Sequence, residues 1–462
     1  MNAVPSAAAG ELLRVLGDLL GDRVTAAPAV RDHHSRGESY HTPAAPDLVA
    51  YPRTTEEISA IVRAAAERNV PIVAFGAGTS LEGQVLALEG GVCVDLTQMN
   101  QVLRVSVEDL DATVQAGVTH RQLNKHLANT GLAFFVDPGA DATLGGMTAT
   151  GASGTTAVRY GTMRENVRGL TVVLADGRVI TTGGRARKSS AGYDLTRLFV
   201  GSEGTLGIIS EVTVRLQPLP ESVAAAVCSF PSIDSAVKTV IATIQVGVPV
   251  ARIELLDEVQ MDAINRFSKL DYPVLPTLFF EFHGPSEREV GDQAGTVEGL
   301  AAENAGSGFA WVTRTEDRTR LWRARHDSYY ASLALRPGAK AWTTDACVPI
   351  SRLADCIVES KRDLDESPLT GTLVGHVGDG NFHMLYLVDP DSPEEMAEAR
   401  RLNERLVNRA LDMGGTCSGE HGVGIGKMRY LPREHGEALD TMRAIKQALD
   451  PRGLMNPGKI LG

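Results

Sequence analysis

The sequence has little that would suit a nucleic-acid-binding protein. It carries 45 lysines and arginines against 57 aspartates and glutamates, for a net charge of −12, and shows no basic stripe. Proteins that bind nucleic acids present a clustered basic surface. We therefore expect no nucleic-acid partner, and an anionic substrate would have to be held by local cations rather than by the overall field.

Paired cysteines and long apolar runs are also missing. The five cysteines are odd in number, scattered and without a C-x-x-C pair, which suits a reducing compartment. The first residues lack the basic and apolar parts of a secretory signal. No apolar run approaches the roughly 20 residues of a membrane-spanning helix. The sequence predicts a soluble, cytoplasmic protein that is not an integral membrane protein.

No low-complexity tract or internal repeat interrupts the chain, whose 462 residues are enough for two or three domains. The clearest boundary is Pro218-Leu219-Pro220, which ends an alternating segment at 207–217. The predicted parts are a helical lead-in, a first domain, a second domain and a last segment, at 1–44, 45–220, 221–415 and 416–462.

The local patterns indicate an α+β fold. Thr54 and Glu57 form a capping box for a helix that ends near Asn69, and a buried strand follows at 71–75. Beyond the proline pair, strands and helices follow one another at 223–230, 232–246, 251–256, 276–282 and 286–304. This order favours an antiparallel sheet covered on one side by helices.

Three glycine-rich stretches lie in the first half, at 76–83, 138–154 and 201–207. None is a G-x-G-x-x-G fingerprint, and the nearest phosphate-loop candidate, Gly426-Lys427, is followed by Met428 rather than Ser or Thr. Small residues expose consecutive backbone N–H groups, which form anion-binding concavities. Each stretch alone could be a tight turn, but together they predict a site that holds a pyrophosphate through backbone donors.

The segment Gly375–His383 reads Gly-His-Val-Gly-Asp-Gly-Asn-Phe-His. Asp379-Gly380 is a two-residue hairpin signal, because both residues can adopt positive φ. Folding back at this pair places His383 opposite His376 on one face, with Cβ atoms about 4.5–5.5 Å apart. That separation suits two imidazoles sharing one metal ion, and the alternative is a pair of surface histidines. Farther along, Glu420-His421 offers a third ligand and another titratable ring.

These motifs occur together in a known family. A resemblance to the FAD domain of the vanillyl-alcohol oxidase type is carried by Pro52-Arg53-Thr54, Gly76–Ser80, Asp137-Pro138-Gly139, Leu144-Gly145-Gly146 and Gly201–Gly207. The hairpin motif, with Gly419–Gly422 and Met455–Lys459, resembles the branch of D-lactate dehydrogenases, D-2-hydroxyglutarate dehydrogenases and the glycolate oxidase flavoprotein subunit. The cytochrome-linked D-lactate dehydrogenases look most similar at Trp322–His326, Ala334–Gly338 and Thr344–Pro349.

The resemblance implies a two-part FAD-binding domain, formed by 45–220 with 416–462, and an α+β cap domain at 221–415. It implies FAD contacts at Phe75, Gly76, Ala77, Gly78, Thr79, Ser80, Gln84, Pro138, Gly139, Ala142, Thr143, Gly145, Gly146, Ala149, Ala152, Ser153, Gly154, Tyr160, Gly161, Glu203, Gly207, Ile209 and Asn456. A divalent metal, zinc or manganese, would be bound by His376, His383 and Glu420. His421 would be the catalytic base, and Arg325 the partner of the substrate carboxylate.

This set of residues suits the oxidation of a D-2-hydroxy acid, D-lactate to pyruvate, with hydride passing from Cα to the flavin. An alcohol proton is too weakly acidic for an imidazole alone, but a metal on the oxygen lowers its pKa, and a nearby histidine is then a competent base. Two histidines and one carboxylate leave open positions for a bidentate hydroxy acid. A guanidinium fork suits its carboxylate, although Arg325 could instead be an exposed arginine.

Three positions qualify the resemblance. Ala77 stands where a glycine is common in the family. The D-2-hydroxyglutarate branch tends to carry a lysine near Thr343 for a distal carboxylate; its absence favours a monocarboxylate such as lactate, although Lys340 is close. No His or Cys lies between 138 and 161, where some relatives anchor the flavin, so we expect FAD to be bound non-covalently.

Several alternatives stay open. Within the branch they are a D-2-hydroxyglutarate dehydrogenase and a glycolate oxidase flavoprotein subunit. An ether-lipid synthase of the same flavin architecture should lack the paired-histidine hairpin. A flavin-free metallohydrolase would use the same metal ligands, and a non-catalytic flavin-binding scaffold would not be reduced by substrate. Electrons would leave to a cytochrome or a quinone-linked carrier. A homodimer, and a peripheral position at the inner face of a membrane, are compatible with the sequence.

Overall fold

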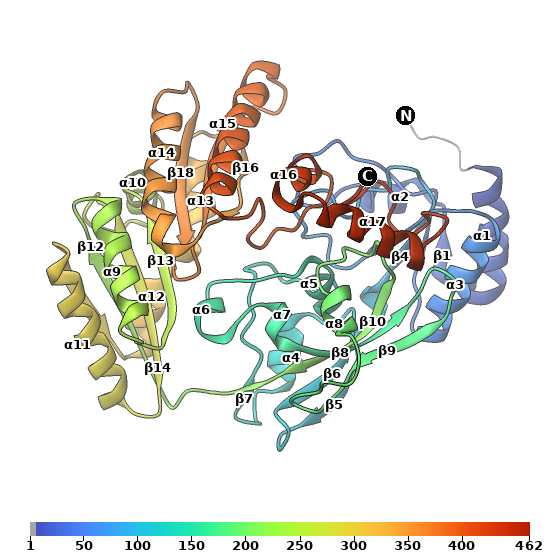
Figure 1. The fold of residues 1–462 in the computed structure, drawn as a ribbon, viewed down its shortest axis with the longest axis horizontal. Coiled ribbons are helices and arrows are strands. Elements are labelled where there is room, and N and C mark those ends of the chain that lie inside the picture. The colour runs from blue at the N-terminus through green and yellow to red at the C-terminus, as the bar shows by residue number, and fades with distance from the viewer. Residues whose placement is uncertain (1–5) are drawn as a thin grey trace. The chain divides into compact units, whose positions relative to one another are not determined.

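The computed structural model describes residues 6–462 and contains two units (Figure 1). The first is built from the chain up to Gly154, from Gly161–Leu219 and from Glu420–Gly462; the second is built from Thr155–Tyr160 and Pro220–Gly419. The predicted boundary at 415/416 lies too early, because Thr416 pairs with Cys347 of the second unit. Within the described residues, no helix has both the length and the apolar character needed to cross a bilayer.

The predicted helical lead-in is not a separate part of the molecule. Helix α1 (Ala7–Leu20) buries Leu12 and Leu16 in the same apolar core as α3 (Thr55–Glu67). Helix α3 is capped at Thr54, whose side chain accepts the N–H of Glu57. The reciprocal half of the predicted capping box is not formed, because the Glu57 carboxylate accepts the Arg53 N–H and pairs with Arg23.

Two sheets and a short ladder form the first unit. The first sheet has the order β1 (Val24–Thr25), β2 (Leu48–Ala50), β4 (Val92–Asp95), β3 (Ile72–Phe75), with β2, β4 and β3 parallel. The second is antiparallel, in the order β5 (Val102–Ser106), β6 (Asp111–Gln115), β10 (Ile208–Arg215), β8 (Val167–Val173), β9 (Val179–Gly183). The ladder pairs β7 (Leu132–Ala133) with β11 (Gln217–Pro218).

Short helices fill the connections of this unit. They are α2 (Pro28–His33), α4 (His120–His126), α5 (Leu144–Thr150), α7 (Met163–Asn166), α8 (Leu195–Phe199), α16 (Leu431–His435) and α17 (Ala438–Leu449). Helix α5 lies inside the glycine-rich stretch 138–154. The sequence pattern did not predict a helix there. Gly, Thr and Ala dominate it, and such residues give no amphipathic period.

The second unit is built on one eight-stranded antiparallel sheet, in the order β15-β12-β14-β13-β18-β19-β16 with β17 paired to β19. The strands are β12 (Ser222–Ser229), β13 (Val250–Leu256), β14 (Thr277–Gly284), β15 (Ser307–Val312), β16 (Lys340–Thr343), β17 (Ala346–Cys347), β18 (Thr370–His376) and β19 (Asn381–Val388). Its helices are α6 (Ala157–Tyr160), α9 (Ile233–Gln245), α10 (Glu258–Ser268), α11 (Glu287–Glu303), α12 (Thr315–His326), α13 (Ser328–Ala334), α14 (Leu353–Asp365) and α15 (Pro393–Asp412).

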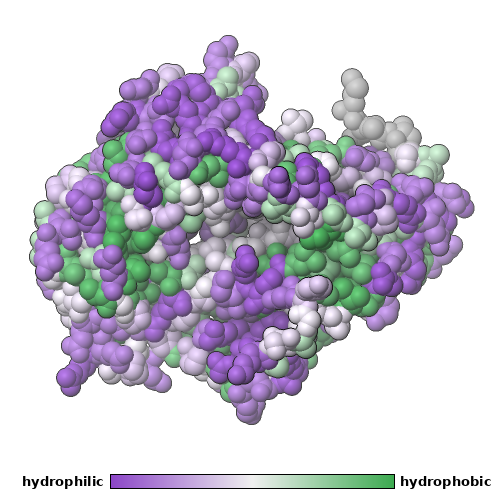
Figure 2. Space-filling view, in the orientation of Figure 1, coloured by the Kyte–Doolittle hydropathy of each residue, from purple (hydrophilic) through white to green (hydrophobic). Residues whose placement is uncertain are grey.

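Helices cover both faces of this sheet rather than one. Phe279 packs with Trp322 of α12 on one face, in a core that α10 and α13 share. On the other face Gly284 lies against Val290 of α11. All eight positions of β14 are buried, and a strand that is buried on both faces is typical of a sheet covered on both sides. The solvent side of α15 is hydrophilic (Figure 2).

The β18–β19 hairpin forms, but in another register than predicted. His376 pairs with Asn381, and His383 pairs with Val374. The loop therefore has four residues, 377–380, rather than the two of Asp379-Gly380, and it closes with a bond from the Asp379 N–H to the His376 carbonyl. Because the slip is two residues, and side chains alternate with a period of two, both histidines still share one face.

The loop generates a stability prediction at Gly380. Its φ is +79°, and a Cβ there would lie 2.1 Å from the Val348 carbonyl oxygen. Gly414 has a similar φ of +77° in the same unit, but a Cβ there would meet nothing within 4 Å. Gly414→Ala should cost about 1–2 kcal/mol, for the left-handed backbone alone, whereas Gly380→Ala should cost more than about 3 kcal/mol.

Urea unfolding of the two variants, followed by tryptophan fluorescence, measures this difference. Equal midpoints for Gly380→Ala and Gly414→Ala would show that the contact with Val348 does not constrain the hairpin loop.

Candidate active site

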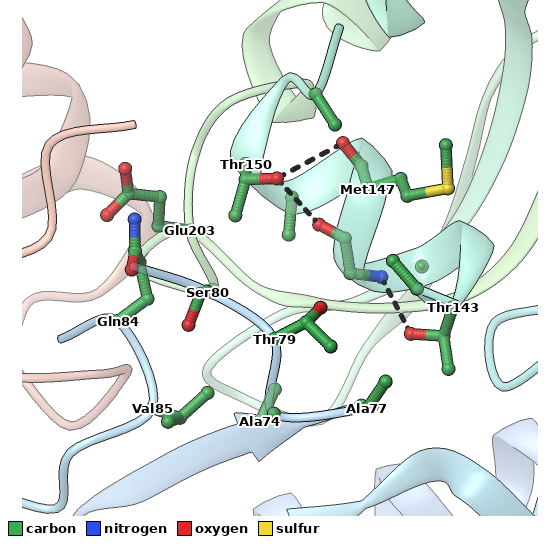
Figure 3. A pocket seen from close by; sticks show the side chains of 18 of the residues that line it. Ala74, Ala77, Thr79, Ser80, Gln84, Val85, Thr143, Met147, Thr150 and Glu203 are labelled. Atoms are coloured by element: carbon green, nitrogen blue, oxygen red, sulfur yellow. Dashed lines mark hydrogen bonds between the residues drawn. The ribbon is translucent and has the colours of Figure 1, made fainter. Parts of the chain in front are cut away.

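The three glycine-rich stretches meet around one cavity in the first unit, drawn in Figure 3. Its volume is about 1210 Å³, part of which is open to solvent. The lining residues that were predicted to contact FAD are Phe75, Gly76, Ala77, Gly78, Thr79, Ser80, Gln84, Pro138, Ala142, Thr143, Gly145, Gly146, Ala149, Ala152, Ser153, Glu203, Gly207, Ile209 and Asn456. Glu420 and His421 line the same cavity.

Four residues predicted to contact FAD do not line it. Gly139 and Gly161 have φ values of +82° and +75°, in the left-handed region that favours glycine. A Cβ on Gly154 would lie 1.9 Å from a main-chain oxygen, so this glycine is required by chain packing. Tyr160 belongs to the second unit, where its hydroxyl lies 2.6 Å from His283 Nδ1. The abundance of glycine in the sequence could not distinguish glycines that line the cavity from glycines that only shape the chain.

The cavity also has lining residues that the sequence did not single out. Leu81, Ala140, Met147, Thr150 and Gly204 lie within the three glycine-rich stretches, whereas Ala74, Val85 and Leu96 lie outside them. Thr150 could have been found, because it lies one helical turn after Gly146 and donates to the Gly146 carbonyl (Figure 3). The apolar members carry no chemical signal, since alanine, valine and leucine fill cores everywhere.

Several glycines of the cavity are required by the protein itself. A Cβ on Gly76 would lie 2.3 Å from Thr143 Oγ1, and one on Gly145 would lie 2.6 Å from the Ala116 Cβ. The N–H of Gly145 donates to the Ala116 carbonyl, and that of Gly146 to Thr143 Oγ1. These two predicted pyrophosphate donors are therefore used inside the protein.

The loop after β3 has donors available for a ligand. The backbone N–H groups of residues 77–80 have no protein acceptor among residues 6–462. Consecutive N–H groups of this kind form an anion-binding concavity. Ser80 Oγ and Asn456 Oδ1 are buried at the cavity and likewise meet no protein partner in the described chain. A ligand with a diphosphate and a polar ring system would satisfy them, so the residues present fit FAD.

Glu203 connects the cavity to the C-terminal part of the chain. It is buried, has a φ of +51°, and its carboxylate accepts the N–H groups of Val423 and Gly424 at 2.6 and 2.8 Å. Burial raises the pKa of Glu203 to about 7, although these hydrogen bonds oppose the rise. A buried carboxylate therefore holds the loop that carries Glu420 and His421 against the N-terminal part of the first unit.

Asn456 and Gln84 complete this connection. The Asn456 amide donates to the carbonyls of Gln84 and Glu203, at 3.0 and 2.7 Å. Gln84 Nε2 in turn donates to the His421 carbonyl at 2.8 Å. The side chains of Gln84 and Glu203 point toward one another in Figure 3. Residues from both ends of the chain thus position the main chain of His421.

In the second unit, the two hairpin histidines have oriented rings. Their centroids are 5.3 Å apart in an edge-to-face arrangement. His376 Nδ1 lies 2.7 Å from Glu254 Oε1, and His383 Nδ1 lies 2.8 Å from the Thr344 carbonyl oxygen. Because both contacts are to acceptors, Nδ1 carries the proton in each neutral ring and the lone pair is on Nε2. This is the usual arrangement of metal-binding histidines, so the pair fits a divalent metal.

Glu254 was not predicted, and it also binds Arg325. Arg325 Nε donates to Glu254 Oε2 at 2.6 Å, which leaves the two terminal nitrogens of the guanidinium for another acceptor. Burial alone would raise the pKa of Glu254, but its interactions with His376 and with the Arg325 guanidinium outweigh burial and lower the pKa. A signal existed in the sequence, because Glu254 is the lone acid in the apolar run Ile253-Glu254-Leu255-Leu256.

Two family models match the chain. The FAD binding domain matches residues 46–183, and the C-terminal domain of FAD linked oxidases matches residues 219–460. The second match spans the whole of β12–β19 and the segment that carries Glu420 and His421.

Curated relatives cover nearly the full chain. A protein of Danio rerio named "Probable D-lactate dehydrogenase, mitochondrial" is 53% identical over 99% of this chain and 93% of its own length. A D-lactate dehydrogenase [cytochrome], mitochondrial, of Arabidopsis thaliana is 48% identical over 98% and 80%. Glycolate oxidase subunit GlcD of Bacillus subtilis is 36% identical over 90% and 89%.

Solved structures share the fold at low identity. A p-cresol methylhydroxylase matches with a TM-score of 0.79 and 18% identity, over 99% of this chain and 98% of that one. An alkyldihydroxyacetonephosphate synthase matches with a TM-score of 0.75 and 22% identity, over 98% and 85%. These likenesses agree with the predicted architecture, an FAD-binding domain of the vanillyl-alcohol oxidase type with an α+β cap.

Because Glu203 is buried and its pKa is raised, we expect the free energy of unfolding to depend on pH. Between pH 4.5 and about 7 the unfolded chain has lost this proton while the folded chain keeps it. The free energy of unfolding should therefore fall as pH rises through this window, by roughly 3 kcal/mol in total. Glu203→Gln should remove that slope, since the amide does not ionise.

Urea unfolding of both proteins at pH 5 and pH 8 gives the comparison. Glu211→Gln, at a partly exposed position of β10, is the matched control and should keep the wild-type slope. Parallel pH profiles for wild type and Glu203→Gln would contradict the raised pKa.

Proposed function

Since the chain belongs to the family of FAD-linked oxidases, we propose that it is a metal-dependent D-2-hydroxy acid dehydrogenase that oxidises D-lactate to pyruvate. Relatives that match nearly the whole chain are named D-lactate dehydrogenases. The proposed dependence on a metal is supported by the orientation of His376 and His383, whose Nδ1 atoms both face oxygen acceptors.

We assign the metal to His376, His383 and Glu420. The third ligand is tied to the hairpin by the chain itself. Gly419 belongs to the second unit, and a Cβ there would lie 2.1 Å from the Asn381 amide nitrogen. Glu420 is the next residue, so its Cα is about 3.8 Å from that of Gly419. A zinc or manganese ion at this ligand set would lower the pKa of the substrate hydroxyl.

Two further side chains bind the substrate and take its proton. Arg325 pairs with the substrate carboxylate through its two terminal nitrogens, since its Nε is bound to Glu254. His421 takes the hydroxyl proton as general base. FAD, when bound, accepts the hydride from Cα. Gln84 and Glu203 hold the His421 loop at the cavity that would receive the cofactor.

The cap strand β16 supports a monocarboxylate substrate. Lys340 and Thr343 are three positions apart in this strand, so their side chains point to opposite faces of the sheet. Lys340, which is exposed, is therefore not a substitute for a lysine at Thr343 that could bind a distal carboxylate. This favours D-lactate over D-2-hydroxyglutarate, which stays the second candidate within the branch.

The names of the relatives bear on the electron acceptor and on the location. We propose a cytochrome as electron acceptor, because relatives carry that word in their names. The same names contain "mitochondrial", so the predicted cytoplasmic location stays a prediction. The FAD-binding family match argues against a flavin-free metallohydrolase. The likeness to the alkyldihydroxyacetonephosphate synthase concerns the fold alone and does not favour ether-lipid synthesis.

An anaerobic reduction panel tests the proposal. Protein loaded with FAD and Zn²⁺ or Mn²⁺ should lose its absorbance near 450 nm when mixed with D-lactate, and much more slowly with L-lactate or D-2-hydroxyglutarate. Treatment with a chelator should abolish the reduction while FAD stays bound. Loaded protein that no D-2-hydroxy acid reduces would refute the assignment.

His421→Gln tests the base. Flavin reduction by D-lactate should slow by about 10²–10⁴-fold, the usual contribution of a general base, while FAD binding is kept. His126→Gln, at an exposed position of α4, is the control and should behave as wild type. Reduction at the wild-type rate in His421→Gln would remove this histidine from the base role.

A further inference from the structure

We infer that Glu254 is a positioning residue, which holds the metal-binding imidazole of His376 and the carboxylate-binding guanidinium of Arg325 in one hydrogen-bonded unit. The inference rests on the proposed function, which gives His376 and Arg325 those roles. Metal binding and recognition of the substrate carboxylate would then depend on one buried side chain that touches neither ligand.

The sheet register sets the position of Glu254. Strands β13 and β18 pair Leu255 with Gly375 and Leu256 with Val374, so Glu254 stands opposite His376. Side chains directly opposite in an antiparallel pair share a face and have Cβ atoms about 4.5–5.5 Å apart. Leu256, two residues on and on that same face, packs in the core with α12, the helix that carries Arg325. The strand pairing and the helix therefore bring both partners to one carboxylate.

The chemistry requires a carboxylate at this position. Glu254 is fully buried, and each of its oxygens accepts one bond, Oε1 from His376 Nδ1 at 2.7 Å and Oε2 from Arg325 Nε at 2.6 Å. An amide has one acceptor oxygen only and would present N–H groups to the second donor. By accepting from Nδ1, Glu254 fixes the His376 ring so that the lone pair of the imidazole is on Nε2. By accepting from Nε, it leaves the two terminal nitrogens of the Arg325 guanidinium pointing away from the Glu254 carboxylate.

A second buried glutamate in the same sheet offers a matched control. Glu281 of β14 also binds a histidine and an arginine, His283 at 2.9 Å and Arg252 at 3.3 Å. His283, however, contacts Tyr160 through its other ring nitrogen, so both nitrogens are engaged inside the protein. Glu281→Gln thus imposes a similar loss of buried charge without touching the proposed ligands.

Metal affinity is the first readout. Competition with a chromophoric chelator should show Zn²⁺ and Mn²⁺ bound about 10–100-fold more weakly by Glu254→Gln, the usual effect of removing the group that orients a metal-binding histidine. Glu281→Gln should bind both metals as wild type does. Equal metal affinity in Glu254→Gln and wild type would overturn the inference.

Arg325→Gln separates the two functions of the unit. It should keep wild-type metal affinity, because Glu254 still holds His376, while KM for D-lactate rises. Glu254→Gln should show both defects at once. A loss of metal in Arg325→Gln as large as in Glu254→Gln would mean that breaking the buried ion pair disturbs the site in general, and the positioning role would be rejected.

Two further results keep the test decisive. If Glu254→Gln does not fold, Glu254→Asp, which keeps the charge but draws it back, should show the same weakened metal binding; unchanged affinity in that variant would overturn the inference. Wild-type protein that binds neither metal would instead refute the proposed metal-dependent function, so the two failures are distinguishable.

Discussion

The candidate site depends on two hydrogen bonds that Glu203 accepts from Val423 and Gly424, across 220 residues of sequence. They bring the loop with Glu420 and His421 to a cavity that the first half of the chain builds. A buried carboxylate is unfavourable unless it is hydrogen-bonded, and its partners here are backbone donors that also need an acceptor. The carboxylate and the two backbone donors therefore satisfy one another, and together with the bonds between Ile72 and residues 454 and 456 they tie the C-terminal segment to the first unit.

The second unit uses the same kind of contact. Glu254 lies in an apolar strand and is surrounded by His376 and Arg325, both of which offset the desolvation of its charge. Removing one partner of such a buried pair leaves a charge without compensation, which typically costs several kcal/mol. In each unit a buried glutamate thus holds part of the candidate site. Glu203 holds the loop that carries His421 through backbone N–H groups, and Glu254 contacts the side chains of His376 and Arg325. The geometry of these residues is coupled to folding stability.

The hairpin shows which features a local sequence pattern can predict and which it cannot. The Asp379-Gly380 signal predicted a chain reversal and the shared face of His376 and His383, and both are present, although the loop has four residues instead of two. It did not predict the register, because the loop of four residues is selected by contacts with other segments: Gly378 lies against Val158, and Gly380 against Val348. In the glycine-rich stretch 138–154, by contrast, the local pattern failed to predict the secondary structure. The predicted backbone donors of Gly145 and Gly146 are bound to Ala116 and Thr143. A helix of small residues such as α5 has no apolar period, so the sequence did not reveal it.

The sequence by itself determined the family, the α+β class, the glycine-rich loops around one cavity and the identities of the paired histidines, because these follow from local residue order and period. Only the tertiary structure decided which donors face the cavity, that helices cover both faces of the cap sheet, and that Glu203 and Glu254 contact residues of the candidate site. Those features arise from contacts between segments far apart in the chain. A lone glutamate in an apolar strand has the same local pattern whether its partner is solvent, a histidine or an arginine, and only strand register and helix packing select among them.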